Sequence, residues 1–267
     1  MAAGSRRSKQ EERRAQMRRK LADLLAEDGR FREAIPNYRK AAMLSDDPDL
    51  DLSLGNAYAF SDLPEQAYES YVRALRLNPH RAETHFSMAE LFLNLGRPSA
   101  AVHAMNRAIE CAPDEDYYLY RLGALYLYAR DFATAEMYFR EVVEMRPTDA
   151  FYRFRLGDAL FGQELWDEAR QEYARAVHLA PFQELYHLRL AATCVRLQDY
   201  EAAVASLTEV VRLAPENPAY RWMLASELAR IGRQREADEH FAVAGALDEY
   251  DVDCVRRWHQ RCGVSLV

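Results

Sequence analysis

One spacing constrains this chain of 267 residues more than any other feature: five columns of similar residues recur every 34 positions. The proline column shows the spacing most plainly, with Pro79, Pro113, Pro147, Pro181 and Pro215. A fixed period of roughly 20–50 residues is typical of stacked repeats, in which each short hairpin buries its apolar face against its neighbours. The spacing therefore predicts a repeat architecture over most of the chain.

Each period holds two stretches with helical apolar spacing, for example residues 117–129 and 132–145. A short polar break separates the two stretches. Where the break is a glycine, as it is three times, we expect that residue to supply the left-handed cap that ends the first helix, and we expect the proline to end the second helix. The breaks fall at Gly29, Asp62, Gly96, Arg130, Glu164, Gln198 and Gly232. Small residues recur at Ala67, Ala101, Ala135, Ala169, Ala203 and Ala237, and at Gly55, Ala89, Gly123, Gly157, Ala191 and Ala225, where they would let helices approach closely.

These columns resemble the tetratricopeptide repeat. The fullest match is Leu54, Gly55, Tyr58, Ala67, Tyr71, Ala74 and Pro79. The resemblance implies an all-α fold, a right-handed α-solenoid of stacked antiparallel helix hairpins. In place of the family's tryptophan, tyrosines recur one position earlier and are expected to fill the space between repeats: Tyr118, Tyr152, Tyr186 and Tyr220. We place seven repeats at 15–48, 48–81, 82–115, 116–149, 150–183, 184–217 and 218–251.

The two ends differ from the repeats. Residues 1–14 are predicted to be a basic N-terminal arm, and 252–267 a capping helix and tail that covers the end of the stack. The first 20 residues carry a net charge of +6 and the rest of the chain −13, so the total is −7. Because the body is acidic, nucleic acid is disfavoured as a partner, although an arm that binds phosphates stays open as an alternative.

Sequence motifs for catalysis are missing. There is no glycine-rich phosphate loop, no HExxH and no nucleophile elbow, so we expect no enzyme activity and no cofactor. Cys254, His259 and Cys262 share one predicted helix, but a structural zinc site takes four ligands, so no metal site is predicted. The absence of a long apolar run and of a leader with an apolar core favours a cytoplasmic protein without a membrane span.

The resemblance implies that the first helix of each repeat lines a concave groove, through repeat positions 2, 5, 9, 12 and 13. These positions hold many large apolar side chains, which on a surface would mark an interaction site. The predicted groove residues are Phe60, Phe86, Tyr117, Tyr120, Tyr128, Phe151, Phe154, Phe161, Leu188 and Trp222. We expect a protein or peptide segment to bind there, which makes the chain an interaction scaffold or adaptor.

Beside the aromatic residues runs a column of arginines, Arg121, Arg155 and Arg189. These could bind carboxylates of a ligand, which would then be apolar with some negative charge. Alternatively they pair with Asp158, Glu184 or other residues of the groove wall. Two further alternatives concern the aromatic residues, which could be core, or could be covered by the arm or by a second copy in a self-assembling scaffold.

Overall fold

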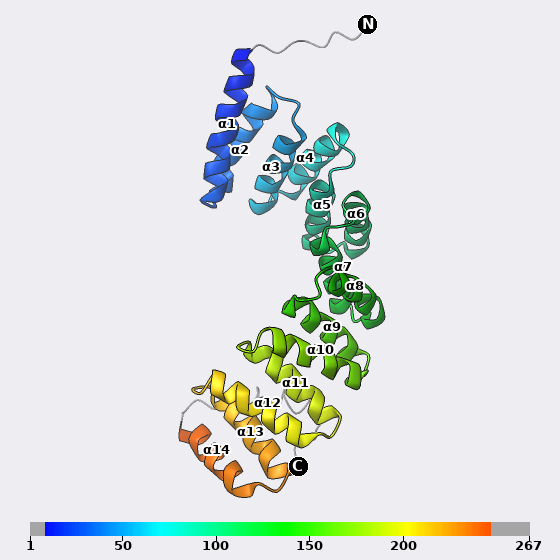
Figure 1. Ribbon diagram of the computed structural model, residues 1–267. Coiled ribbons are helices and arrows are strands. Elements are labelled where there is room, and N and C mark those ends of the chain that lie inside the picture. Colours follow the sequence, from blue (N-terminus) through cyan, green and yellow to red (C-terminus); the bar gives the residue numbers. More distant parts are fainter. Residues whose placement is uncertain (1–8, 247–267) are drawn as a thin grey trace. The chain divides into compact units, whose positions relative to one another are not determined.

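A computed structural model describes residues 9–246, which divide into two compact units between Tyr118 and Leu119. All regular structure in the described part is α-helical (Figure 1), which confirms the predicted all-α class. The fourteen helices are α1 (Lys9–Glu27), α2 (Phe31–Ala42), α3 (Pro48–Phe60), α4 (Pro64–Leu77), α5 (Ala82–Asn94), α6 (Pro98–Cys111), α7 (Asp116–Tyr128), α8 (Phe132–Met145), α9 (Ala150–Gly162), α10 (Trp166–Leu179), α11 (Glu184–Arg196), α12 (Tyr200–Leu213), α13 (Pro218–Arg230) and α14 (Gln234–Ala246).

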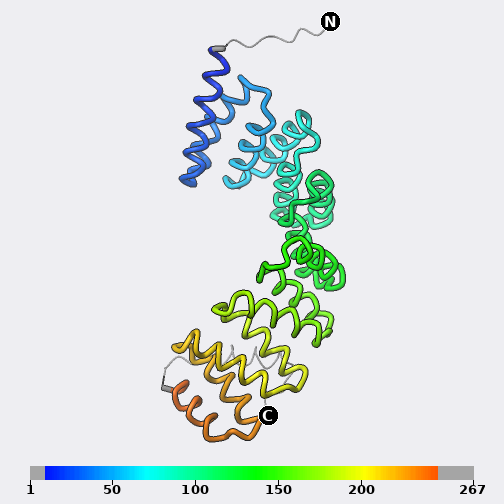
Figure 2. Tube along the Cα trace, viewed as in Figure 1, coloured from blue at the N-terminus to red at the C-terminus, as the bar shows by residue number. Residues whose placement is uncertain are grey.

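Consecutive helices pack in pairs as antiparallel hairpins. In the first unit α1 packs on α2, α3 on α4 and α5 on α6. In the second unit α9 packs on α10, α11 on α12 and α13 on α14, as the tube in Figure 2 shows for the C-terminal hairpins. Within each unit the second helix of a hairpin packs on the first helix of the next, for example α2 on α3 and α10 on α11. The predicted stack of helix hairpins is confirmed, whereas its handedness stays a prediction.

The predicted ends of the chain are described only in part. Helix α1 begins at Lys9, so residues 9–14 of the predicted arm belong to that helix. The predicted capping helix over 252–267 lies outside the described residues, as does the start of the arm over 1–8.

A left-handed residue ends the first helix of every hairpin, at the seven breaks predicted from the sequence and not only at the three glycines where a left-handed cap was expected. In the first hairpin, Gly29 N–H donates to Ala26 O at 2.9 Å and Arg30 N–H to Leu25 O at 2.8 Å, the paired bonds of a Schellman motif. Glycine adopts this conformation without strain, but four of the turns use other residues. The left-handed residues have φ between 59° and 80° and are Gly29, Asp62, Gly96, Arg130, Glu164, Gln198 and Gly232.

The five prolines of the column end second helices, as predicted. Helices α4 and α8 end at Leu77 and Met145, two residues before Pro79 and Pro147. The helix stops early because the proline ring disfavours helical backbone angles at the residue that precedes it. That intervening residue, Asn78 in the first case, has φ −138° and ψ 91° and has left the helical region.

Glycine or alanine on the first helix lets a large side chain of the second helix lie against its backbone. A Cβ atom on Gly123 would lie 2.8 Å from Cε1 of Phe139, and one on Gly157 would lie 2.7 Å from Cε1 of Tyr173. Both rings are fully buried. The small-residue column therefore sets the spacing within each hairpin, because any larger side chain would collide with the opposing ring.

Tyrosines of the second helices also tie some hairpins together by hydrogen bonds. The hydroxyl of Tyr71 donates to Oδ1 of Asn56, and that of Tyr173 to Oδ1 of Asp158, both at 2.8 Å. The equivalent bond in the first hairpin joins Tyr38 to Asp23, also at 2.8 Å. A buried phenol needs such an acceptor, since leaving it unpaired costs about 1–3 kcal/mol.

Candidate functional site

The aromatic residues at repeat position 5 pack beneath the tyrosine of the following repeat. In the first unit Phe86 stacks on Tyr118, with ring centroids 5.1 Å apart. In the second unit Phe154 stacks on Tyr186 at 4.7 Å, and Tyr120 lies against Tyr152 at 5.7 Å. The expectation that the tyrosine column fills the space between repeats is thus confirmed at these three tyrosines.

This packing corrects one predicted groove residue. Phe154 is only 4% exposed, because Tyr186 covers one side of its ring and Tyr173, at 5.6 Å, the other. It belongs to the hydrophobic core of the second unit and is not available to a ligand. Repeat position alone did not indicate this burial, since Tyr120 occupies the same position in the preceding repeat and is half-buried.

Three other predicted residues of the second unit are half-buried. Phe161 lies edge-on against Trp166, with centroids 4.7 Å apart, and Leu188 packs on the core. Trp222 lies edge-on against Phe241 at 5.1 Å. Each therefore presents part of its side chain to the surface while the remainder supports the hairpin.

Exposed apolar surface is found at repeat positions 2 and 13 instead, at the two ends of the first helices. In the second unit Tyr128 is 90% exposed at the end of α7, and Phe151 is 41% exposed at the start of α9. Phe151 also contacts Tyr120 edge-on at 5.2 Å. Leu185, 34 residues after Phe151, is likewise exposed. Sequence reasoning missed Leu185, although its repeat position would have identified it.

The first unit shows the same preference for the helix ends. Phe60, the last residue of α3, is 70% exposed and stacks on Phe31 at 4.6 Å. Tyr117, near the start of α7, is exposed and contacts Phe86 at 5.5 Å. Phe86 itself is half-buried.

Two of the three column arginines converge on one carboxylate. Nη1 of Arg155 lies 3.0 Å from Oδ2 of Asp158, and Nε of Arg189 lies 3.5 Å from Oδ1 of the same side chain. Tyr173 donates to this Oδ1 as well. The alternative that the arginines pair with the groove wall is therefore the one observed for this pair. The third arginine, Arg121, is half-buried and also has an interaction partner.

Opposing effects act on the pKa of the Asp158 carboxyl. Burial raises it, and this effect exceeds the lowering by Arg189, Arg155 and the hydroxyl of Tyr173. With Asp158 ionised, the two guanidinium groups and one carboxylate carry a net charge of +1. Both arginines keep about a quarter of their side chains exposed, at 24% and 28%. The cluster can therefore still attract a negatively charged group.

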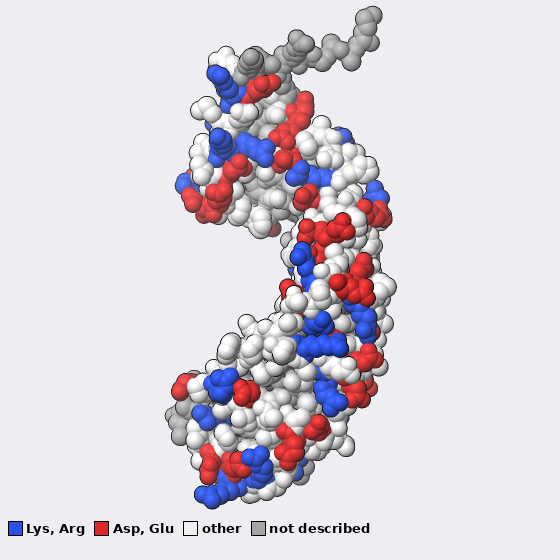
Figure 3. All heavy atoms as spheres, in the orientation of Figure 1, with Lys and Arg blue, Asp and Glu red and all other residues white. Residues whose placement is uncertain are grey.

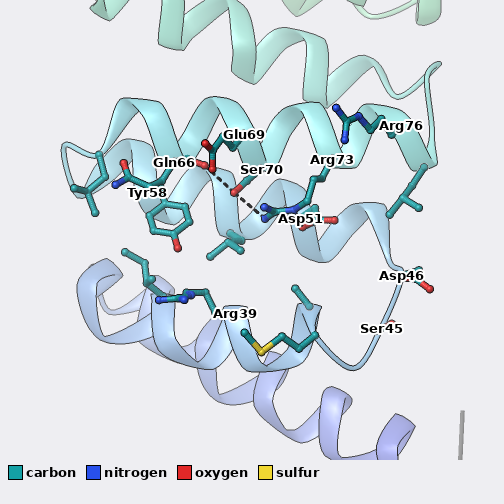
Figure 4. A pocket seen from close by; sticks show the side chains of 16 residues that line it. Arg39, Ser45, Asp46, Asp51, Tyr58, Gln66, Glu69, Ser70, Arg73 and Arg76 are labelled. Atoms are coloured by element: carbon teal, nitrogen blue, oxygen red, sulfur yellow. Dashed lines mark hydrogen bonds and ion pairs between the residues drawn. The ribbon is translucent and has the colours of Figure 1, made fainter.

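A separate hollow of about 850 Å³ opens in the first unit between α2 and the hairpin of α3 and α4 (Figure 4). Some of its polar groups bind one another: Nε of Arg73 lies 3.1 Å from Oδ1 of Asp51, and Nη2 of Arg73 donates to Oγ of Ser70 at 3.2 Å. Burial raises the pKa of Asp51, against the lowering by Arg73. Charges of both signs line the hollow, so it favours no ligand of a particular charge.

The described residues hold no metal-binding cluster and no membrane-spanning helix. No group of histidine, cysteine or carboxylate side chains between residues 9 and 246 is arranged to hold a metal ion. Cys254, His259 and Cys262 lie outside this range. In the same part of the chain, no helix combines the length and apolar character that crossing a bilayer needs.

Comparisons with known proteins agree with this architecture. Three models of the tetratricopeptide repeat match residues 61–124, 120–184 and 186–217, together more than half of the chain. Tetratricopeptide repeat protein 13 of Homo sapiens is 33% identical over 123 residues, which cover 43% of this chain and 14% of that protein. The chain thus spans only a small part of that relative's length.

Two solved structures show the same fold. MamA from Desulfovibrio magneticus RS-1 is 26% identical, with a TM-score of 0.58 over 63% of this chain and 96% of that one. The C-terminal part of a repeat-containing protein from Cytophaga hutchinsonii is 17% identical, with a TM-score of 0.74 over 89% of this chain and 98% of that one. By its repeat columns, its paired helices and these matches, the chain belongs to the tetratricopeptide repeat family.

Proposed function

We propose that this chain is a non-catalytic scaffold that binds an apolar segment of a partner protein along the first helices of its second unit. The repeat family generally mediates protein–protein interaction and is typically non-catalytic. The observation that carries the proposal is the exposure of Phe151, a large ring at the start of a first helix whose neighbour Tyr120 supports it from one side. A ring held in this way can bury area in a partner at little entropic cost.

The dimensions of the surface define the kind of ligand. Repeat positions 2 and 13 are separated by eleven residues, which corresponds to about 16 Å along a helix. Phe151 and Leu185 occupy position 2 and Tyr128 occupies position 13. A ligand that contacts both ends would need about five extended residues, or about three turns of helix.

The charge between the two ends defines the ligand further. Arg155 and Arg189 reach the surface in the middle of their helices, around the buried Asp158. Their net positive charge favours a ligand that places an acidic residue between two apolar anchors. Because Asp158 already neutralises part of this charge, we expect the apolar anchors to supply most of the affinity and the acidic residue to supply selectivity.

A selection of displayed random peptides against the full chain tests this proposal. Binding of the selected peptides would then be measured by calorimetry with the wild type, with Phe151→Ala/Leu185→Ala, and with the control Met137→Ala. Met137 is also exposed, but it lies on the second helix α8. We expect the double variant to lose at least about tenfold in affinity and the control to lose little, since anchors at the centre of an interface dominate its energy.

Two results would count against the proposal. One is a set of selected peptides that bind the double variant as tightly as the wild type. The other is a failure to select any peptide with apolar residues. Substitution of Phe154 is not used, because removing this core ring would destabilise the fold by about 3–5 kcal/mol and confound the measurement.

A further inference from the structure

The first hairpin carries an apolar hollow that its own fold leaves open. It has a volume of about 570 Å³ and lies between α1 and the C-terminal end of α2. Met17 and Met43, which line it, are 73% and 71% exposed, and Leu21 beside them is 47% exposed. Three large apolar side chains exposed side by side are unusual for a hairpin of this size, and such surfaces mark interaction sites.

The charged side chains around this hollow are all basic. Arg14, Arg18 and Lys40 line it together with the apolar residues, and no described acidic side chain does. Nη1 of Arg18 donates to the neutral amide of Asn37 at 2.9 Å, so this contact leaves its charge uncompensated. Figure 3 shows basic side chains over α1 in this part of the molecule. An apolar floor with a basic rim is complementary to a segment that is apolar and acidic.

Three acidic segments of this sequence have comparable charge, each with four acidic and no basic residues in seven: 45–51, 110–116 and 247–253. The first two are already engaged, since Asp47 pairs with Arg19, Asp51 with Arg73 and Glu110 with Arg107. The third contains Leu247 and Tyr250 beside its acidic residues Asp248, Glu249, Asp251 and Asp253.

The N-terminal residues do not complement the hollow. Residues 1–8 contain Arg6 and Arg7 and no acidic residue, so they would add positive charge to a basic rim. A bilayer is also a poor fit, because the hollow is a trough between two helices and a flat surface would contact its edges first. A narrow peptide can reach the floor of such a trough.

We propose that this hollow, defined by Arg14, Met17, Arg18, Leu21, Lys40, Met43 and Leu44, binds residues 247–253 of a second copy of the chain. Leu247 and Tyr250 would cover the apolar floor, and the flanking carboxylates would face the basic rim. The site lies in the first unit and does not depend on the function proposed above. A seven-residue contact is small, so the association is weak and reversible.

The proposed contact joins two different surfaces, so each bound copy leaves one free hollow and one free segment. Such heterologous contacts extend the assembly unless the chain closes into a ring. The average mass should therefore continue to rise with concentration. A contact between two identical patches would instead make the mass level off at that of a dimer. Raising the salt concentration should reverse the rise, because exposed charge pairs are screened.

The experiment combines sedimentation of the full chain over a wide concentration range with binding of a labelled synthetic peptide of residues 247–253. The variant Arg14→Glu/Lys40→Glu should reduce peptide affinity by about tenfold and abolish the rise in mass. Arg212→Glu/Arg235→Glu is the matched control, because it changes the net charge equally and both side chains are exposed in the second unit. Circular dichroism establishes that each variant keeps its helices.

A charge exchange makes the test specific. Asp248→Lys/Asp251→Lys alone should also abolish association, and combining it with Arg14→Glu/Lys40→Glu should restore association to within about threefold of the wild type. The inference is overturned by a chain that stays monomeric at the highest concentration, by a variant at the hollow that binds the peptide normally, or by a failure of the exchange to restore binding. Binding to anionic vesicles without binding to the peptide would overturn it in favour of a membrane surface.

Discussion

The contact between Gly123 on α7 and Phe139 on α8 allows a quantitative test of how the hairpins are built. In Gly123→Ala the new Cβ would lie 2.8 Å from Cε1 and 3.0 Å from Cδ1 of Phe139. Carbon atoms attract best at about 3.5–4.0 Å, so the ring or the helix must shift by roughly 0.7 Å. The ring has little freedom to do so, because it is fully buried and the guanidinium carbon of Arg155 lies 5.9 Å from its centroid.

Two effects of opposite sign determine the size of this change. Overpacking a core costs about 1–3 kcal/mol, and alanine is favoured over glycine within a helix by about 1 kcal/mol. Because the buried ring has little freedom to shift, we expect overpacking to cost about 2–3 kcal/mol. Gly123→Ala should therefore lower the free energy of unfolding by about 1–2 kcal/mol, which corresponds to a fall of about 2–8 °C in Tm. Gly245→Ala is the control, because no atom lies within 4 Å of its Cβ and it should cause no loss.

The decisive measurement is the stability of a double variant in which a smaller side chain at Phe139 removes the collision. Two inner hairpins that carry alanine at this position, Ala89 and Ala191, place Met105 and Leu207 where Gly123 meets Phe139. Phe139→Leu should cost about 1–2 kcal/mol alone, but its combination with Gly123→Ala should show a favourable coupling of at least about 1 kcal/mol. Urea unfolding followed by circular dichroism measures all four proteins. A stable Gly123→Ala variant, or costs that simply add, would refute the reasoning.

Three further predictions follow from the turns, the thiols and the buried carboxylate. Glu164→Gly should stabilise the chain by up to about 1 kcal/mol in thermal unfolding, because Glu164 has φ 64° and glycine adopts this conformation freely; a loss of stability would contradict it. Burial raises the pKa of Cys194 to about 11, so at pH 8 only about one thiol in a thousand is ionised. Cys194 should therefore be alkylated far more slowly than the less buried Cys111, as measured by mass spectrometry. Asp158→Ala should lower unfolding stability by about 1–3 kcal/mol, because Tyr173 loses its acceptor and the arginines their carboxylate, whereas Asp158→Asn, which keeps an acceptor oxygen, should lose less.

Much of the fold could be predicted from the sequence because the residues that end and space the helices recur at the same position of each repeat. Gln198 illustrates this, since its phase within the repeat predicted a break between helices there; its left-handed φ of 59° was not predicted, because glutamine has no particular preference for that conformation. Proline acts in the same local manner, because its ring disfavours helical backbone angles at the residue before it. Features that depend on one or two neighbouring residues recur in every repeat and can be predicted from it.

The candidate site could be predicted only in part, because exposure depends on the neighbouring repeat. Phe154 and Tyr120 occupy equivalent positions, yet Phe154 is buried between two rings while Tyr120 keeps part of its ring at the surface. The arginine column presents the same difficulty. Asp158 draws Arg155 and Arg189 together, and their geometry follows from packing across two repeats that no single repeat encodes.

The central claim is that a partner segment lies along the first helices of the second unit. Site-specific photo-crosslinking in the native cell tests it most directly, with a photoreactive phenylalanine analogue placed at Phe151 or Tyr128, and at Met137 on the second helix as the control. The account predicts that the same partner protein is crosslinked from Phe151 and from Tyr128 and not from Met137, and that the crosslinked peptide contains apolar residues flanking an acidic one. Crosslinking of that partner from Met137 alone, or from none of the three positions, would contradict the account.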